Sequence, residues 1–164
     1  MAFMFSPEEI LEMAIKIEDM GMLYYETFAK KTKDNKVADI FTFLAGEESK
    51  HKALFTKIFE ESKKEDFFTP YDYEEASAYF NALIESRFFI KPDAVMKIMD
   101  KVENENDAIQ NAIIFEKDTI LYFHELGAMI KEKHKDLIQR LITEEKNHVM
   151  KLVGLKLALG TTTK

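Results

Sequence analysis

The sequence contains no cysteine among its 164 residues. This absence excludes disulfide bonds, zinc ribbons, thiol catalysis and any iron centre that cysteine would hold. It does not identify the cellular compartment, because a residue that is absent reports no redox state. Glycine and proline are also scarce, with 5 and 3 residues. So few turn-forming residues are unusual for an all-β protein and normal for a chain of long helices.

Long hydrophobic runs are absent as well. The longest uncharged stretch, residues 76–84, has nine residues, whereas a membrane span needs about 20 apolar residues. The first residues lack the basic and apolar regions of a signal peptide. The net charge of -7 is expected to repel nucleic acid and anionic membranes. We therefore expect a soluble cytoplasmic protein with neither nucleic acid nor membrane among its partners.

The sequence does show helical patterning. A chain of 164 residues has a suitable length for one domain over residues 1–164. Ser6, Pro7 and Glu9 have the spacing of a capping box at a helix start, and Gly160 is expected to close the last helix. Apolar residues recur at helical spacing. They predict long helices over 7–31, 36–62, 106–130 and 135–158, and shorter helices over 73–88 and 93–103.

The two halves of the chain repeat each other. Matching positions are Glu18 and Glu116, Glu48 and Glu145, and His51 and His148, with offsets of 116 − 18 = 98, 145 − 48 = 97 and 148 − 51 = 97. Two helical hairpins of one design are thus joined by a linker of roughly 40 residues, long enough to run back along a helix of about 38 Å. This organisation predicts an all-α four-helix bundle with one long helical crossover between its second and third long helices.

All four repeated glutamates lie on apolar helix faces, and we expect no lysine or arginine to neutralise them there. Burial of one unpaired carboxylate costs several kcal/mol, and four together would also repel one another. Two divalent cations would balance the four negative charges if both histidines were neutral. A single Glu-x-x-His motif is a weak signal, because it often occurs by chance on a helix surface, but here two occupy matching places. We therefore predict a dimetal site with the ligands Glu18, Glu48, His51, Glu116, Glu145 and His148.

Oxygen ligands from carboxylates favour iron, with manganese as the alternative, over zinc. Glu47 and Glu144 are one helical step, about 100°, away from the ligand face, so we expect them to be solvated and not to bind metal. His124 and His134 have no partner motif, and we expect them at the surface.

Tyr25 is the candidate catalytic residue. It lies seven residues after Glu18, on the same helix face. Two interpretations stand: its hydroxyl hydrogen-bonds a carboxylate of the metal site, or Tyr25 is an ordinary core tyrosine. Tyr24 and Tyr122 match in the repeat but lie off this face, so we expect them to serve packing.

At the repeated motifs the sequence resembles the ferritin-like superfamily, most closely its rubrerythrin branch. The resemblance extends along nearly the whole chain and implies a ferritin-like bundle with two iron ions. By this resemblance the bridging ligands are Glu48 and Glu145, the terminal carboxylates are Glu18 and Glu116, and His51 and His148 bind one metal each.

The sequence departs from that family in two ways. Peroxide-reducing rubrerythrins typically carry an additional glutamate three residues before the ligand of the third helix, where this chain has Ile113. They also usually carry a rubredoxin module with four cysteines. Without such a module, the resemblance implies that electrons come from an external carrier such as a rubredoxin-like protein.

Three functional hypotheses follow. The leading one is a non-haem diiron enzyme that reduces hydrogen peroxide or dioxygen. The alternatives are ferritin-like oxidation and handling of Fe(II), and a bundle whose metals are only structural. We also expect a homodimer or small homo-oligomer, because the segment 73–103 has an apolar stripe that must cover its own bundle or a neighbour's. The stripe includes Tyr79, Phe80, Leu83, Phe88, Phe89 and Ile90.

Overall fold

A computed structural model describes residues 5–70, 73–86 and 92–161. Its helices are α1 (Pro7–Lys31), α2 (Asn35–Ser62), α3 (Tyr73–Ser86), α4 (Pro92–Met99), α5 (Glu105–Met129) and α6 (Glu132–Thr161). The only strand-like pairing within those ranges is one isolated bridge between Phe68 and Ile130. The prediction of an all-α fold is confirmed.

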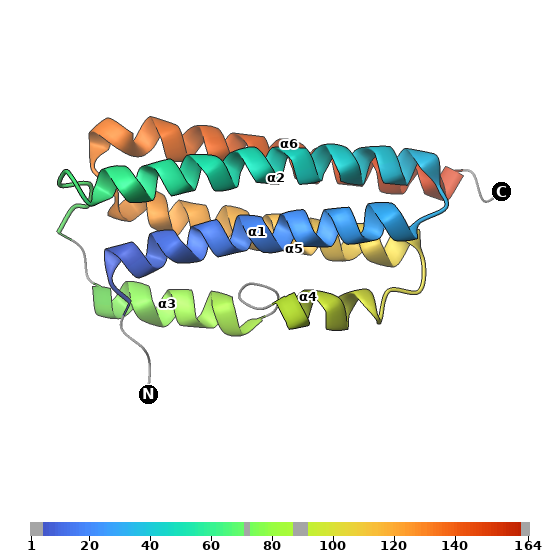
Figure 1. The fold of residues 1–164 in the computed structure, drawn as a ribbon, viewed down its shortest axis with the longest axis horizontal. Coiled ribbons are helices and arrows are strands. Elements are labelled where there is room, and N and C mark those ends of the chain that lie inside the picture. Colours follow the sequence, from blue (N-terminus) through green and yellow to red (C-terminus); the bar gives the residue numbers. More distant parts are fainter. Residues whose placement is uncertain (1–4, 71–72, 87–91, 162–164) are drawn as a thin grey trace.

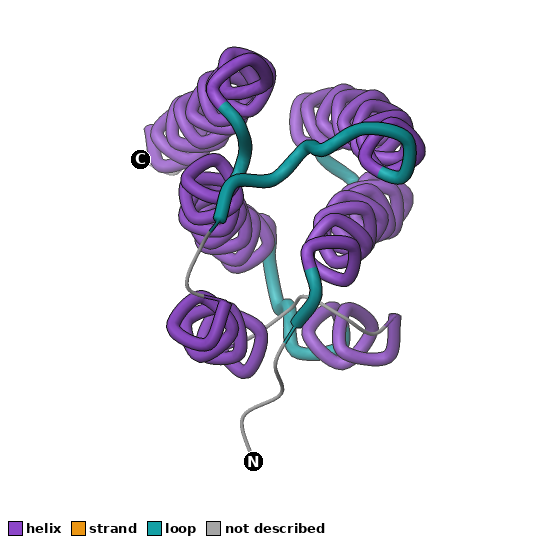
Figure 2. Tube along the Cα trace, turned by 90° about the vertical axis from the view of Figure 1, so that its left-hand side faces the viewer, coloured by secondary structure: helices purple, strands orange, loops and turns teal. Residues whose placement is uncertain are grey.

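The four long helices form a bundle of two hairpins, in which α1 packs on α2 and α5 packs on α6. Seen end on, they occupy the corners of a square (Figure 2). The shorter helices α3 and α4 lie end to end along one side of the bundle (Figure 1). There α4 packs against α1 and α3 against α5, so the crossover covers one face of the bundle.

Contacts of the loop after α2 show the direction of the crossover. The backbone N–H of Thr69 donates to the carbonyl of Met129 at 2.9 Å, and that of Lys131 donates to the carbonyl of Phe67 at 3.1 Å. The end of α2 therefore lies beside the turn between α5 and α6. Because α5 ends there, it begins at the opposite end of the bundle, and the predicted long crossover is confirmed.

The predicted start of α1 is confirmed, whereas the end of α6 differs. Ser6 Oγ accepts from the backbone N–H of Glu9 at 3.2 Å, and the Glu9 carboxylate accepts from the Ser6 N–H at 2.8 Å. Gly160 does not close α6, which continues through it to Thr161. No described glycine has a positive φ, so Gly160 does not form the left-handed cap that the prediction required. The last short helix also ends earlier than predicted, at Met99.

The described part of the crossover buries only part of its predicted apolar stripe against its own bundle, since Phe80 is buried whereas Tyr79 is 40% exposed. Ala76, Phe80, Val95 and Met99 are all buried, and the Phe80 ring centroid lies 4.7 Å from that of Tyr122. The predicted stripe residues 88–90 lie outside the described residues. A second copy is not needed to bury Phe80, and association of copies stays a prediction.

Two buried tyrosines tie the hairpins together at matching places in the repeat. The Tyr24 hydroxyl donates to the carbonyl of Ala108 at 2.8 Å, and the Tyr122 hydroxyl donates to the carbonyl of Ile10 at 2.7 Å. Each bond runs from one hairpin to the start of a helix in the other. Their packing role is as predicted.

In the part of the chain that is described, none of the helices has the length and apolar character needed to cross a membrane.

Candidate metal centre

The six predicted ligands lie on the four long helices and meet inside the bundle. The structure places Glu18 on α1, Glu48 and His51 on α2, Glu116 on α5, and Glu145 and His148 on α6. None of the six is more than 3% exposed. Each carboxylate lies within an apolar stripe of its helix, and each stripe faces the core. The carboxylates therefore meet there and form one polar cluster.

The cluster divides into two groups of four residues. One contains Glu18, Glu48, His51 and Glu145, and the other contains Glu48, Glu116, Glu145 and His148. Within each group, the atoms that could bind a metal lie within 4.8 Å of one another. Glu48 and Glu145 belong to both groups, so each of them can contribute to two adjacent ion positions.

The separate oxygens of Glu145 face different histidines. Its Oε1 lies 2.7 Å from His51 Nδ1 and its Oε2 lies 3.0 Å from His148 Nδ1. The oxygens of Glu48 are arranged in the same way, because Oε2 lies 4.0 Å from His51 Nδ1 and Oε1 lies 3.3 Å from His148 Nδ1. The two imidazole rings are stacked, with centroids 5.5 Å apart. This is the arrangement that bridging carboxylates need.

The two carboxylates predicted as terminal ligands, Glu18 and Glu116, each lie near one histidine. Glu18 Oε2 lies 3.7 Å from His51 Nδ1, and Glu116 Oε1 lies 3.6 Å from His148 Nδ1. Close packing on α1 is possible because Gly21 has no side chain. A Cβ at that position would lie 2.8 Å from the Phe115 ring and 3.4 Å from Glu48 Cγ. The glycine thus lets α1 approach the cluster.

The donor atoms of the cluster fit bound cations. Nine buried side-chain nitrogen or oxygen atoms of the described residues have no hydrogen-bond partner, and seven of them belong to the cluster: Glu18 Oε1 and Oε2, Glu48 Oε1 and Oε2, His51 Nδ1, Glu116 Oε2 and Glu145 Oε1. Buried polar atoms are nearly always satisfied in folded proteins. A concentration of unsatisfied acceptors at one place indicates that positive ions complete it.

Without such ions, protons must compensate the buried charge. Burial, and then the negative charge of Glu145, raise the pKa of Glu116 to about 8. Burial and the charge of Glu48 raise the pKa of Glu18 well above its ordinary value. Burial acts to lower the pKa of His51, but the contact with Glu145 outweighs it and raises that pKa to about 9. The metal-free cluster is therefore expected to hold several protons at neutral pH.

Metal binding is consequently expected to release at least about two protons per chain at pH 7, because ligands must be deprotonated. Glu116 and His51, with pKa values of about 8 and about 9, are the groups that lose them. Calorimetric titration with Co(II) in two buffers of different ionisation enthalpy would measure the release. Fewer protons should be released at pH 9 than at pH 7. Release that is absent at pH 7 would contradict the charge state described for the cluster.

The Tyr25 hydroxyl donates a hydrogen bond to Glu116 Oε1, and both residues are fully buried. Burial, and then the nearby charge of Glu116, raise the pKa of Tyr25 well above its ordinary value. The tyrosine thus keeps its proton directly beside the cluster. Of the two interpretations of Tyr25, the structure agrees with the first, because the hydroxyl contacts a carboxylate of the candidate site.

The neighbouring glutamates differ from each other in a way that sequence spacing did not show. Glu47 forms an ion pair with Lys50, which lowers its pKa. The Glu144 side chain is 51% exposed, as expected of a solvated residue, yet its Oε2 lies 2.8 Å from His51 Nε2. Its place directly before a predicted ligand is the one signal in the sequence that could have indicated this contact.

The remaining histidines lie apart from the cluster, but only one of them has the surface position that was predicted for both. His124 is exposed. His134 is half-buried, with its ring stacked on Phe67 at 4.1 Å between centroids, and its Nε2 lies 3.6 Å from Glu65. Neither belongs to a group of potential metal ligands among the described residues.

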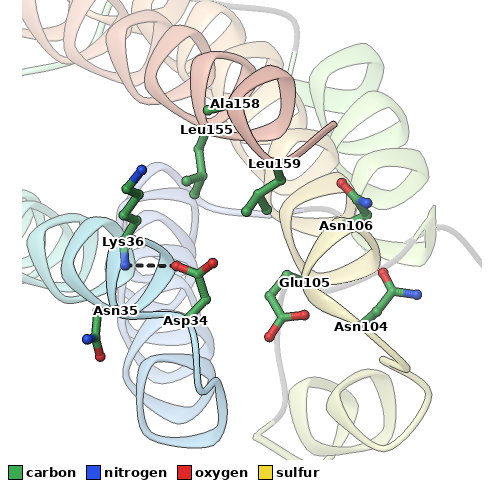
Figure 3. Close-up of a pocket in the computed structure, with 9 residues that line it drawn as sticks. All are labelled: Asp34, Asn35, Lys36, Asn104, Glu105, Asn106, Leu155, Ala158 and Leu159. Atoms are coloured by element: carbon green, nitrogen blue, oxygen red, sulfur yellow. Dashed lines mark hydrogen bonds between the residues drawn. The ribbon is translucent and has the colours of Figure 1, made fainter. Parts of the chain in front are cut away.

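A surface pocket of about 550 Å³ lies at the end of the bundle where α2 and α5 begin (Figure 3). Its carboxylates already have local partners. Asp34 accepts from the backbone N–H of Lys36 at 2.8 Å, and Glu105 accepts from the Thr32 hydroxyl at 2.9 Å. None of the six cluster residues lines this pocket, so it is separate from the candidate metal centre.

Comparison with known proteins agrees with this geometry. The rubrerythrin family matches residues 9–156. A search of curated proteins found no match. A crystal structure of a ferritin-like diiron-carboxylate protein from Thermotoga maritima is similar, with a TM-score of 0.69, 21% sequence identity, and coverage of 93% of this chain and 95% of that chain; at this identity the likeness shows the fold. Because the family match covers most of the chain, including most of each long helix and every residue of the cluster, the chain belongs to the rubrerythrin family.

Proposed function

We propose that the protein is a diiron oxidoreductase that reduces hydrogen peroxide or dioxygen with electrons from an external carrier. The observation that carries the proposal is the division of the oxygens of Glu48 and Glu145 between the two histidines. The proposed iron ligands are Glu18, Glu48, His51, Glu116, Glu145 and His148.

The composition of the cluster supports iron. Four carboxylates and two neutral imidazoles would carry a charge of about −4, which two divalent ions neutralise. Each group of four offers three carboxylates and one imidazole. Such oxygen-rich sites suit iron or manganese, whereas zinc sites are usually tetrahedral and richer in nitrogen or sulfur.

Two bound iron ions would supply the two electrons that convert hydrogen peroxide and two protons into two molecules of water. These 164 residues contain no cysteine to hold a second iron centre, so a separate carrier, such as a rubredoxin-like protein, is proposed to return the electrons. The protein's own part is to hold the ligands in a dry core. Phe55 and Phe123, which pack with ring centroids 4.9 Å apart, belong to that core and help exclude water.

Tyr25 is proposed to serve the reaction as a fixed proton donor. Its hydroxyl is fully buried, is held by Glu116 and stays protonated because its pKa is raised. Ile113 lies at the position of the additional glutamate that peroxide-reducing relatives carry, and it is an apolar core residue here. The proposed site therefore has one carboxylate fewer than those relatives, and we expect a slower reaction.

Stopped-flow oxidation of the diferrous protein tests the proposed reaction. Peroxide is expected to oxidise the protein at least about tenfold faster than it oxidises free Fe(II), equivalent to about 1.4 kcal/mol of barrier, and faster than dioxygen does. Tyr25→Phe, which removes only the hydroxyl, is the matched control. It should keep both metal ions and react more slowly with peroxide.

Other outcomes assign other functions. If dioxygen oxidises the protein much faster than peroxide, reduction of dioxygen or ferritin-like oxidation of Fe(II) replaces the reduction of peroxide, and the absence of the additional carboxylate at Ile113 would agree with that result. If neither oxidant reacts faster than with free Fe(II), the metals are structural. An unchanged rate in Tyr25→Phe would restrict Tyr25 to packing.

A further inference from the structure

Glu144 lies directly before Glu145 on α6, and its carboxylate reaches across to α2. Its Oε2 is 2.8 Å from His51 Nε2. An ionised carboxylate only accepts hydrogen bonds, so Nε2 carries the proton and donates it. The other ring nitrogen of His51, Nδ1, faces the oxygens of Glu18, Glu48 and Glu145. When a metal ion displaces the proton from Nδ1, the lone pair of this nitrogen points at the ion. The outer contact thus sets which nitrogen faces the cluster.

The matching residue in the other hairpin does not do the same for His148. Glu47 stands in the repeat where Glu144 stands, but it pairs with Lys50, one turn further along its own helix. At the position that matches Lys50, the second hairpin has the uncharged Asn147. No lysine at that position competes for Glu144, and its carboxylate is held by His51. The two halves of the cluster are therefore alike in their inner residues and different in their outer ones.

We propose that Glu144 is a positioning residue for the metal centre, and that its contact makes the half of the centre containing His51 bind its metal ion more tightly than the half containing His148. A carboxylate that accepts the outer proton of a metal-binding histidine fixes the ring and increases the basicity of the other nitrogen. Removal of such a partner typically lowers metal affinity by about 10- to 100-fold. This inference rests on the proposed metal centre.

The test is a titration of the metal-free protein with Co(II) in competition with a chelator, which yields two affinities. Glu144→Gln is expected to lower the tighter affinity by about 10- to 100-fold and to leave the weaker one unchanged. Glu47→Gln is the matched control, because it removes one negative charge from the equivalent position. It is expected to change neither affinity. The Glu144 and Glu47 side chains both reach the surface, with exposed fractions of 51% and 21%, so both variants should unfold at the same temperature as the wild type when free of metal.

A second measurement reports on the proposed hydrogen bond itself. In the Co(II)-loaded wild type, the Nε2 proton of His51 should give a shifted proton NMR signal that disappears in D2O. This signal should remain in Glu47→Gln. In Glu144→Gln it should broaden or vanish, because the carboxylate that shields the proton from exchange with water is gone. A purely structural role of Glu144 would not change it selectively.

Three results would overturn the inference. Equal loss of affinity in both glutamine variants would indicate a general charge effect. Unchanged affinities and an unchanged NMR signal in Glu144→Gln would show that the contact has no role in metal binding. If the wild type bound no Co(II), the proposed metal centre itself would be rejected. If the wild type bound two ions and Glu144→Gln had the same two affinities, only the role of Glu144 would be rejected.

Discussion

Replacement of Glu48 by alanine is expected to remove most of the bound metal, from two ions per chain to less than one under conditions that saturate the wild type. Glu48 is 1% exposed, and its two oxygens face different histidines, so both ion positions lose a ligand at once. Loss of an outer partner of a ligand already costs about 10- to 100-fold in affinity, and loss of a bridging ligand should cost at least as much. Elemental analysis after anaerobic loading with Fe(II) and desalting measures the effect.

Glu47→Ala is the matched control for this experiment. Glu47 is the adjacent residue on α2, but it pairs with Lys50 and belongs to neither group of potential metal ligands. We expect this variant to retain both ions. The metal-free variants should be compared by circular dichroism, so that loss of metal is not confused with loss of folding. Equal metal loss in the two variants would mean that the ligand face of α2 has been assigned wrongly.

Metal loading is expected to raise the midpoint of thermal unfolding by about 10–20 °C. An ion at 100 times its dissociation constant stabilises the folded state by about 2.7 kcal/mol, and two ions by about 5 kcal/mol. In a domain of this size each kcal/mol shifts the midpoint by about 2–4 °C. Melting curves of the metal-free, Fe(II)-loaded and chelator-treated protein, recorded without oxygen, would measure the shift.

The shift should be larger at pH 8 than at pH 6. The pKa of Glu116 is about 8 in the folded metal-free protein and close to its ordinary value when the chain is unfolded. Between these two pKa values the folded state binds a proton that the unfolded state has released, so the metal-free protein loses stability as pH rises. The raised pKa of His51 acts in the same direction. Because the metal replaces these protons, a shift that is the same at both pH values would contradict this account of the core.

Much of the fold could be predicted from the sequence because local rules decide it. The capping box of Ser6 and Glu9, the helical spacing of apolar residues and the internal repeat predicted the four long helices and the crossover. Local rules were less successful at helix ends. Gly160 continues α6 instead of closing it, since a glycine can adopt the helical conformation as well as the left-handed one.

The spacing of side chains also predicted which residues approach one another. A residue type repeated every three or four positions occupies one face of a helix, so four glutamates and two histidines on apolar faces had to meet in the core. The charge requirement of that core then predicted a metal centre. Both inferences depend only on helix geometry and on the cost of buried charge, which are known before the helices are arranged in space.

Only the tertiary structure decided which atoms face each other. Spacing determines which residues share a helix face. It determines neither how the helix is rotated against its neighbours nor how far a flexible side chain reaches. The sequence therefore placed Glu47 and Glu144 equally, one step off the ligand face, whereas in the folded chain one pairs with Lys50 and the other holds His51. The choice depends on how closely α2 and α6 approach and on a lysine present in one hairpin and replaced by Asn147 in the other.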